Sequence, residues 1–311
     1  MQIVLPGALP GPNAASALIP HVLKAAPTLV SWLEQGRATV QKADPSANGC
    51  TSLEQWLLQS RGFIKHDGQN LGSGLGPLWA NKVSEDDQAI WLVELVHVSP
   101  SRDSAVLLPA HGLDIRADHS GALLESAQAL FAGTGFTLQP DSTTHWRIHL
   151  PPDFTPLCAS PALVSLTTLN DYWPQDLNTR PWRRLVNELQ MLWYEHPVNT
   201  ERGAEGLAPI NSLWLFGGAS PSQLTKATPE PAKHDDLFAP GRVEDWGGWI
   251  AALANLEQTV FKPLAASGAA PELALLGRNR IIEITPRTPG LLSRFLPHHK
   301  QAWRIWWSSQ D

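Results

Sequence analysis

The sequence predicts a mixed α/β protein, and three observations lead to this fold class. Short runs rich in apolar and β-branched residues, such as residues 90–98, alternate with longer segments of helical periodicity, such as residues 119–131. Hydrophobic residues make up 43% of the chain and charged residues 17%, a balance typical of a folded globular protein. The 311 residues exceed what one compact core usually needs, so we expect two lobes.

The N-terminal part predicts one strand and two helical segments. Residues 2–5 form an apolar run that a proline and a glycine end, and residues 15–35 have a helical pattern that two prolines interrupt. A further helix is expected over residues 52–59, with Ser52 as its N-cap. The glycines of residues 68–77 do not have the spacing of a phosphate-binding loop, so we expect an ordinary loop there.

The middle of the chain predicts a compact block of strands around one long helix. The helix is expected over residues 119–131. The strands are expected at residues 90–98, 104–110, 113–116, 135–139 and 145–150. This order is typical of a smaller α+β unit of the split-βαβ kind. Residues 151–180 are rich in proline and are expected to cross the surface.

These patterns predict two lobes with approximate boundaries. Residues 1–88 and 181–311 are expected to form one discontinuous α/β lobe, and residues 89–180 the smaller α+β lobe. After a loop over residues 218–242, the first lobe is expected to continue with a helix and two strands. These lie at residues 246–266, 272–276 and 280–285.

The segment from Trp182 to Gly218 combines an amphipathic helix, a polar connection and an apolar strand. Apolar residues recur at the i, i+3, i+4 and i+7 positions from Trp182 onward, and Pro197 disfavours helical geometry at the residue before it. Residues 210–216 are so uniformly apolar that we expect a strand covered on both faces. Glycines 217 and 218 at its end would let backbone N–H groups approach a ligand.

The polar residues of this segment are the candidates for binding a small anion. They are His196, Asn199, Arg202 and Asn211, together with Asn187 on the polar face of the helix. An arginine can hold a phosphate or carboxylate through two parallel hydrogen bonds. The alternative is structural: the two asparagines in the connection bond to turn backbone, and the arginine is solvated.

Composition excludes several classes of function. The net charge of −6 gives no general support for nucleic acid binding. The two cysteines are far apart and imply neither a disulfide framework nor a zinc cluster. The chain begins without a signal peptide pattern and has no apolar run of membrane-spanning length, so we expect a cytoplasmic protein without membrane partners.

Catalytic constellations are not evident, and no catalytic residue is assigned. No serine lies in a nucleophile-elbow pattern. The densest group of metal-type ligands is His234, Asp235 and Asp236, in a proline-rich loop where solvated charge is the alternative, so no metal site is predicted. The C-terminal Trp303, Trp306 and Trp307 could form a docking face on a helix or belong to a strand, although core packing is the default for tryptophan.

Residues 196–219, HPVNTERGAEGLAPINSLWLFGGA, and the preceding NELQMLWYE resemble a bacterial protein family. Its members are RpfE-type regulatory proteins or cofactor-independent phosphoglycerate mutase-like proteins. The pattern N-x₂-R-x₃-G-x₂-P-x-N is similar to one in archaeal-type cofactor-independent phosphoglycerate mutases. It is carried here by Asn199, Arg202, Gly206, Pro209 and Asn211. The opening MQIVLPGALP and the block WLVELVHVSPSRDSAVLL also resemble the bacterial family.

The resemblance implies an alkaline-phosphatase-superfamily ancestry, with a remnant of that sheet in the larger lobe. Active mutases of this type use two divalent metals and a serine that accepts the phosphoryl group. Their first metal ligand follows strand one in an Asp-Gly motif, where this chain has Leu5-Pro6-Gly7-Ala8. We therefore expect a relative that has lost metal-dependent phosphoryl transfer, needs no cofactor and acts in regulation, binding a phosphorylated or carboxylated small molecule or a protein partner.

Two alternatives stay open. The first is an active mutase or phosphatase with rearranged ligands for Mn²⁺ or Zn²⁺, which would make the chain an enzyme. The second is a protein-interaction module that uses the tryptophan-rich C-terminus.

Overall fold

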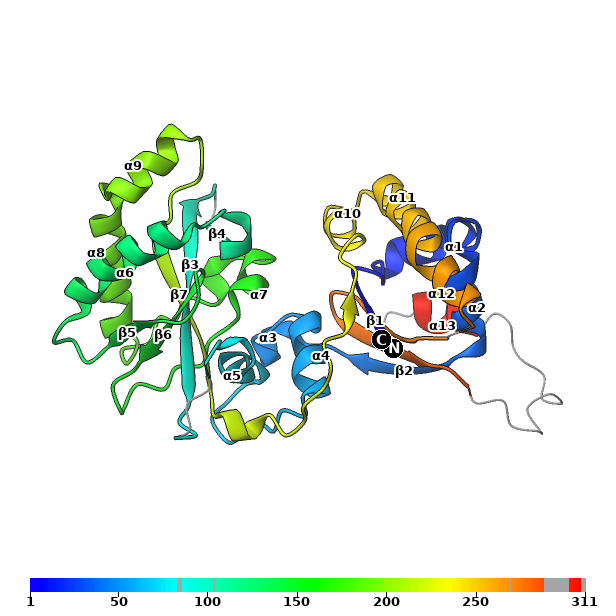
Figure 1. The fold of residues 1–311 in the computed structure, drawn as a ribbon, viewed down its shortest axis with the longest axis horizontal. Helices are drawn as coiled ribbons and strands as arrows, with labels where there is room; N and C mark the ends of the chain where they lie inside the picture. Colours follow the sequence, from blue (N-terminus) through cyan, green and yellow to red (C-terminus); the bar gives the residue numbers. More distant parts are fainter. Residues whose placement is uncertain (83–85, 103, 269, 288–301, 309–311) are drawn as a thin grey trace. The chain divides into compact units, whose positions relative to one another are not determined.

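The computed structural model describes residues 1–311 except 83–85, 103, 269, 288–301 and 309–311 (Figure 1). The chain forms two compact units: residues 1–44 with 229–311, and residues 45–228. Each unit contains a β-sheet and several helices, which confirms the predicted α/β class. Among the described residues, no helix is long and apolar enough to cross a membrane.

The sheet of the first unit has five strands in the order β2-β10-β9-β1-β8. Three of them are parallel, namely β1 (Gln2–Pro6), β8 (Ala232–Lys233) and β9 (Glu272–Leu276). The other two strands are β10 (Arg280–Thr285) and β2 (Arg37–Lys42). β10 pairs antiparallel with β9, and β2 pairs antiparallel with β10. Since β1 and β8 are parallel and Val4 pairs with Lys233, the carboxyl ends of these two strands lie at the same edge of the sheet.

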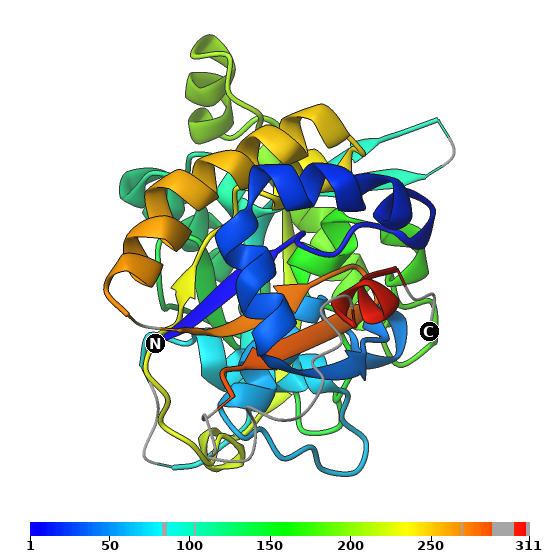
Figure 2. The same ribbon diagram turned by 90° about the vertical axis from the view of Figure 1, so that its right-hand side faces the viewer.

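The helices of the first unit pack against its sheet (Figures 1 and 2). They are α1 (Pro12–Ala25), α2 (Pro27–Gln35), α10 (Phe238–Arg242), α11 (Trp246–Leu256), α12 (Lys262–Ala266) and α13 (Trp303–Ser308), with a π-helical turn at Glu257–Phe261. Ile3 and Leu5 of β1 contact the same core cluster as Trp249 of α11. Trp303 and Trp307 are also in this core, each 1% exposed, so the C-terminal tryptophans form a packed helix and not an exposed docking face.

The sheet of the second unit has the connectivity of a split βαβ fold. Its strands are β3 (Ile90–Pro100), β4 (Ala105–Leu108), β5 (Thr137–Pro140), β6 (His145–His149) and β7 (Ser212–Ala219). β3 pairs antiparallel with both β7 and β6, and β6 pairs antiparallel with β5. β4 pairs antiparallel with the C-terminal end of β3. With α6 (Ala117–Phe131) between β3 and β5, and α8 (Arg180–Tyr194) between β6 and β7, this is a β-α-β-β-α-β arrangement.

Helices α6 and α8 cover one face of this second sheet and close its main core. Leu123 of α6, Val186 of α8 and Trp146 of β6 are all fully buried in one cluster. The strongly amphipathic pattern of α8 explains this packing, since its apolar stripe is the predicted one beginning at Trp182.

Shorter elements complete the second unit. They are α3 (Pro45–Asn48), α4 (Ser52–Ser60), α5 (Leu75–Trp79), α7 (Pro161–Ser165), α9 (Pro197–Ala204) and the 3-10 turns at Leu71–Gly74, Ala110–Gly112, Leu169–Asp171 and Pro221–Gln223. A Cβ atom on Gly217 would lie 2.9 Å from the Cα of Gly76. Gly217 therefore admits the backbone of α5, and a Cβ atom on Gly218 would lie 2.5 Å from the indole of Trp91, so the glycine pair near the end of β7 packs against protein and not against a ligand.

The unit boundaries differ from the expected ones, 1–88 with 181–311 and 89–180. Strand β7 pairs with β3 from Ser212 to Ala219, and α8 packs on α6, so residues 180–219 complete the smaller unit. Residues 45–79 also belong to it, since α5 contacts both β7 and β3.

Several local predictions were wrong. Residues 68–77, expected as an ordinary loop, contain the 3-10 turn at Leu71–Gly74 and the start of α5. Residues 218–242, also expected as a loop, contain β8 and α10. Residues 113–116, expected as a strand, form the loop before α6. Residues 197–204, expected as a turn, form helix α9, in which Pro197 occupies the first turn and His196 is the N-cap. The N-cap of α4 is Thr51, not Ser52, because Thr51 and Glu54 form a reciprocal capping box.

Candidate functional site

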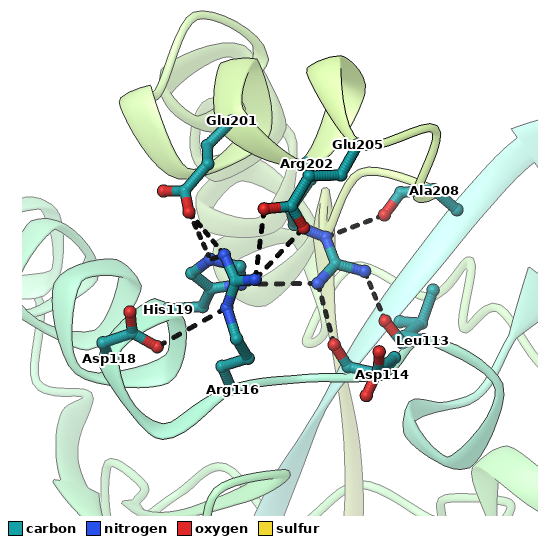
Figure 3. Close-up of polar contacts among 9 residues, drawn as sticks. All are labelled: Leu113, Asp114, Arg116, Asp118, His119, Glu201, Arg202, Glu205 and Ala208. Atoms are coloured by element: carbon teal, nitrogen blue, oxygen red, sulfur yellow. Dashed lines mark hydrogen bonds and ion pairs between the residues drawn. The ribbon is translucent and has the colours of Figure 1, made fainter.

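Four of the five predicted anion-binding residues lie where α8, α9 and β7 meet in the second unit, and Asn187 lies in the middle of α8. Figure 3 shows the part of this region around Arg202. The helix α9 packs against α6, and the loop before α6 passes beneath it. The burial and hydrogen bonds of each predicted residue decide whether it can contact a ligand.

Arg202 is fully buried, with 0% of its surface exposed. Its Nε donates to the carbonyl of Ala208 at 2.9 Å, and its Nη1 donates to the carbonyl of Asp114 at 3.1 Å. Its Nη2 donates to the carbonyl of Leu113 (Figure 3). The guanidinium thus joins the α9–β7 connection to the loop before α6. Burial lowers the pKa of Arg202 from its ordinary value. The geometry offers no N–H group to a phosphate or carboxylate from solvent.

The side chain of Asn199 also forms hydrogen bonds only to backbone groups. Its Nδ2 donates to the carbonyls of Trp193 and Ile210, both at 2.8 Å, and its Oδ1 accepts from the N–H of Ile210 at 2.8 Å. The residue is 9% exposed. It ties the end of α8 to the start of β7, so its role is the structural one of bonding to backbone.

Asn211 bonds to the backbone of the neighbouring strand β3 and His196 to the backbone at the start of α9, whereas Asn187 is exposed on α8. The Oδ1 of Asn211 accepts from the N–H of Val98, and its Nδ2 donates to the carbonyl of the same residue. The Nδ1 of His196 accepts from the N–H of Val198 at the start of α9. The structure brings Asn199, Arg202 and Asn211 together at the connection between α8 and β7. Their side chains form hydrogen bonds to backbone groups there and do not face a ligand site.

A charged cluster that sequence reasoning missed lies over Arg202. Arg116, 40% exposed at its side chain, pairs with Glu201 of α9 and with Glu205, the residue that follows α9. Its Nη2 lies 2.6 Å from Nε2 of the buried His119 (Figure 3). The i, i+4 spacing of Glu201 and Glu205 places them on one helix face, which is the signal that could have pointed to this cluster. The acidic pair neutralises Arg116, so the cluster presents no free cation to an anion.

The second unit also buries two carboxylates on the other face of its sheet. Glu54 accepts hydrogen bonds from Thr51 and, at 2.7 Å, from the hydroxyl of Ser160, which caps α7. Burial raises the pKa of Glu54, and the nearby Glu94 raises it further. Glu94 accepts from the N–H of Ala110 at 2.7 Å and lies 3.0 Å from Nε2 of His145. Both carboxylates join elements distant in sequence, which a single sequence does not reveal.

Neither cysteine has the character of a nucleophile. Both thiols are free, and Cys50 is buried. Burial raises the pKa of the Cys158 thiol to about 12 and raises that of Cys50 as well. The thiolate, which is the reactive form, is therefore disfavoured at both positions at neutral pH.

The carboxyl end of β1 is filled by other parts of the first unit. Gly7 has φ +76°, and a Cβ atom there would lie 2.6 Å from the carbonyl oxygen of Leu237 and 2.7 Å from the Cα of Phe238. The indole N–H of the fully buried Trp249 donates to the carbonyl of Gly7 at 2.9 Å. No side chain larger than hydrogen fits at residue 7 without movement of the backbone of residues 237 and 238.

The predicted metal-type ligands follow β8 at the same edge of the sheet. The N–H of His234 donates to the carbonyl of Val4, and Asp235 pairs with Lys233 at 2.7 Å. Asp235 and Asp236 are exposed. Across the described part of the chain, no three His, Cys, Asp or Glu side chains converge as metal ligands.

Comparison with known proteins gives limited similarity. No family model matches the sequence, and no curated protein matches it. Among solved structures, the chain is similar to a cofactor-independent phosphoglycerate mutase from Thermoplasma acidophilum, at TM-score 0.35 and 13% identity, over 91% of this chain and 88% of that one. It is also similar to the PH0037 protein from Pyrococcus horikoshii, at TM-score 0.46 and 13% identity, over 92% and 86% of the two chains. Scores at this level assign neither a family nor an activity.

Proposed function

We propose that this chain is a phosphoglycerate-mutase-like protein that acts by binding, in a regulatory role, without metal-dependent phosphoryl transfer. The sequence resemblance of residues 196–219 to that family is the starting point. The observation that carries the proposal is the filled carboxyl end of β1 around Gly7.

Ligands of open α/β sheets bind at the carboxyl ends of the parallel strands. In the mutases that the sequence resembles, a metal ligand follows strand one. In this chain the buried Pro6 precedes Gly7, and Leu237, Phe238 and Trp249 pack around Gly7, so neither residue places a carboxylate at the end of β1. This packing supports a loss of the metal centre, beyond the missing aspartate in the sequence.

The remaining acidic residues at this edge do not fit a two-metal centre. Such a centre holds two cations about 3.5–4 Å apart through several converging carboxylates and imidazoles. Asp235 is paired with Lys233, and the described residues offer no converging set of three ligands. We therefore derive no catalytic step through a metal.

Metal content and turnover test the proposal together. The purified chain is incubated with excess Mn²⁺ or Zn²⁺, freed of unbound metal and analysed for metal by mass spectrometry. Turnover of 3-phosphoglycerate and of p-nitrophenyl phosphate is then measured. We expect no stoichiometric metal and no turnover above buffer. Stoichiometric metal accompanied by metal-dependent turnover would overturn the proposal.

The alternative function is an active mutase or phosphatase with rearranged ligands. One observation favours it: His234, Asp235 and Asp236 directly follow β8, at the edge of the sheet where β1 ends. Under this alternative, the double variant Asp235→Asn with Asp236→Asn loses metal-dependent turnover. The matched control is Glu230→Gln, an exposed acidic residue just before β8, which keeps it.

A further inference from the structure

The hairpin between β5 and β6 brings a hydroxyl, an imidazole and a carboxylate together in a way that the proposed function does not use. His145 is the first residue of β6 and lies directly opposite Glu94 in the ladder with β3. Its Nε2 lies 3.0 Å from Oε2 of Glu94, and its Nδ1 lies 3.1 Å from Oγ1 of Thr144. A nucleophile, a base and a group that orients the base, each within hydrogen-bonding reach of the next, are the signature of nucleophilic catalysis.

The carboxylate of Glu94 selects which nitrogen of His145 carries the proton. The Glu94 side chain is 9% exposed, and its Oε1 accepts from the N–H of Ala110 at 2.7 Å. A carboxylate oxygen accepts hydrogen bonds, so the neutral imidazole donates its one N–H from Nε2 to Oε2. Nδ1 then keeps a lone pair, which faces the hydroxyl of Thr144 as a general base would.

Neighbouring groups on paired strands hold the imidazole and the hydroxyl in place. The ring of Phe216 in β7 packs on that of His145, with centroids 5.6 Å apart and an interplanar angle of 69°. The N–H of Leu95 in β3 donates to the carbonyl of Thr144 at 3.0 Å, which fixes the backbone that carries the hydroxyl. Sites carried by strands are held more precisely than sites on loops.

Of the two hydroxyls near His145, that of Thr144 fits the role of nucleophile. The Oγ of Ser142 accepts from the N–H of His145 at 2.9 Å and from that of Thr144 at 3.3 Å, so it closes the turn. It lies 3.5 Å from Nδ1, farther than Oγ1 of Thr144, and the two hydroxyls are 3.4 Å apart. Thr144 and His145 are both partly exposed, so a small substrate has access to them.

We propose that Thr144 and His145, positioned by Glu94, form an acyl-transfer site that hydrolyses small uncharged carboxylic esters. Oγ1 of Thr144 attacks the carbonyl carbon, and Nδ1 of His145 takes its proton. The bond to the leaving oxygen breaks, the alcohol departs with that proton, and the acyl group stays on Thr144. Water then attacks the acyl carbon and gives a proton to Nδ1, which returns it to Oγ1 as the carboxylic acid leaves. The negative charge of Glu94 stabilises the imidazolium formed in each step.

This inference goes beyond the proposed function, because it needs neither a metal nor a phosphate ester. An uncharged ester fits better than an anionic one, since Glu94 and Asp141 of the same hairpin are both acidic. The carboxylate of Asp141 accepts from the N–H of Asn81 at 3.0 Å.

Hydrolysis of p-nitrophenyl acetate tests the inference, with mass spectrometry of the quenched protein to locate the acetyl group. Thr144→Val removes the hydroxyl and keeps the branched shape, and its matched control is Thr143→Val, an exposed residue of the same turn. Because any exposed histidine reacts slowly with this ester, His145→Asn is paired with His149→Asn at the exposed end of β6.

We expect the acetyl group on Thr144 and a rate at least about 10²-fold lower in Thr144→Val and His145→Asn, as for the loss of general base catalysis. Thr143→Val and His149→Asn keep the wild-type rate, and Thr144→Ser is still acetylated at residue 144. Unchanged melting temperatures show that the variants fold. The inference is overturned if the wild type is not acetylated at Thr144, or if each control loses as much rate as the variant it matches.

Glu94→Gln tests the positioning role through a signal that a merely structural role would not move. The amide oxygen can still accept from the N–H of Ala110, but the amide N–H₂ faces Nε2 of His145 and favours the ring proton on Nδ1. We expect ¹⁵N NMR of the His145 ring to show this change of tautomer, together with loss of acetylation of Thr144. An unchanged tautomer with full acetylation would remove Glu94 from the site.

Discussion

The side chain of Asn211 forms both hydrogen bonds that a neighbouring strand would form with Val98. Its Oδ1 accepts from the N–H of Val98 at 2.8 Å, and its Nδ2 donates to the carbonyl at 2.8 Å. The backbone N–H of Asn211 also donates to the carbonyl of Val96 at 3.1 Å. The ladder between β3 and β7 ends at the pair Val96 and Ser212, so this amide extends it by one step.

Asn211→Ala should therefore destabilise the protein without affecting any ligand site. The change leaves the N–H and the carbonyl of Val98 without partners, and we expect a loss of about 1–3 kcal/mol in the free energy of unfolding. Urea denaturation measures it. The control is Asn187→Ala, an exposed asparagine on α8, which should change stability by less than about 0.5 kcal/mol. Equal stabilities of the two variants would contradict the structural role.

Arg202→Met should lower stability more than Asn211→Ala does. Methionine keeps much of the side-chain volume but leaves the carbonyls of Leu113, Asp114 and Ala208 without their donor. We expect a loss of more than about 3 kcal/mol, since each unpaired buried group costs about 1–3 kcal/mol. The control is Arg184→Met on the exposed face of α8, whose pair with Glu188 lies at the surface and should contribute little. A fully stable Arg202→Met protein that loses binding of an anion would instead restore the anion-site interpretation.

The sequence predicted elements whose signal is local. Strands at residues 272–276 and 280–285 have the bounds of β9 and β10, because short apolar runs between turn residues define them. The split βαβ unit was also predicted, but its last helix and strand were assigned to the other lobe. The pairing of β7 with β3 joins residues more than a hundred positions apart, and no local pattern encodes it.

The candidate site shows the same limit at the level of single residues. Arginine is typical both of anion sites and of buried backbone contacts, and the composition around Arg202 does not distinguish them. Its carbonyl partners Leu113 and Asp114 lie almost ninety positions earlier in the chain. Pro197 correctly predicted the end of α8, but the same proline begins α9, because proline fits the first turn of a helix.

Glu54 should make stability depend on pH in the direction opposite to that of an ordinary surface carboxylate. Burial raises the pKa of Glu54 in the folded protein above its value in the unfolded chain, about 4.3. As the pH rises above this value, the unfolded chain loses the proton first. The stabilisation from protonated Glu54 is complete below the unfolded pKa and is lost as the pH rises through the folded pKa.

Glu54→Gln removes this titration, so the free energy of unfolding of wild type relative to Glu54→Gln should fall as the pH rises above the unfolded pKa of about 4.3. Urea denaturation of both proteins across acid to neutral pH measures the difference. The amide keeps an acceptor for Thr51 and Ser160, so the variant should fold. A difference that is constant across this range would show that the folded pKa is not raised.

Gly7 should tolerate neither a methyl group nor a carboxylate. Its φ of +76° strains any other residue, and a Cβ atom would overlap the carbonyl oxygen of Leu237 at 2.6 Å. We expect Gly7→Ala and Gly7→Asp each to lose more than about 1 kcal/mol of stability, since left-handed backbone alone costs about 1–2 kcal/mol in L-residues. Gly11→Ala is the control, because Gly11 has φ −59° and a Cβ atom there would meet no other atom within 4 Å. Introducing the aspartate should also bring no Mn²⁺ or Zn²⁺ binding, measured by calorimetry. A stable Gly7→Asp protein that binds metal would show that the end of β1 can still open to form a metal centre.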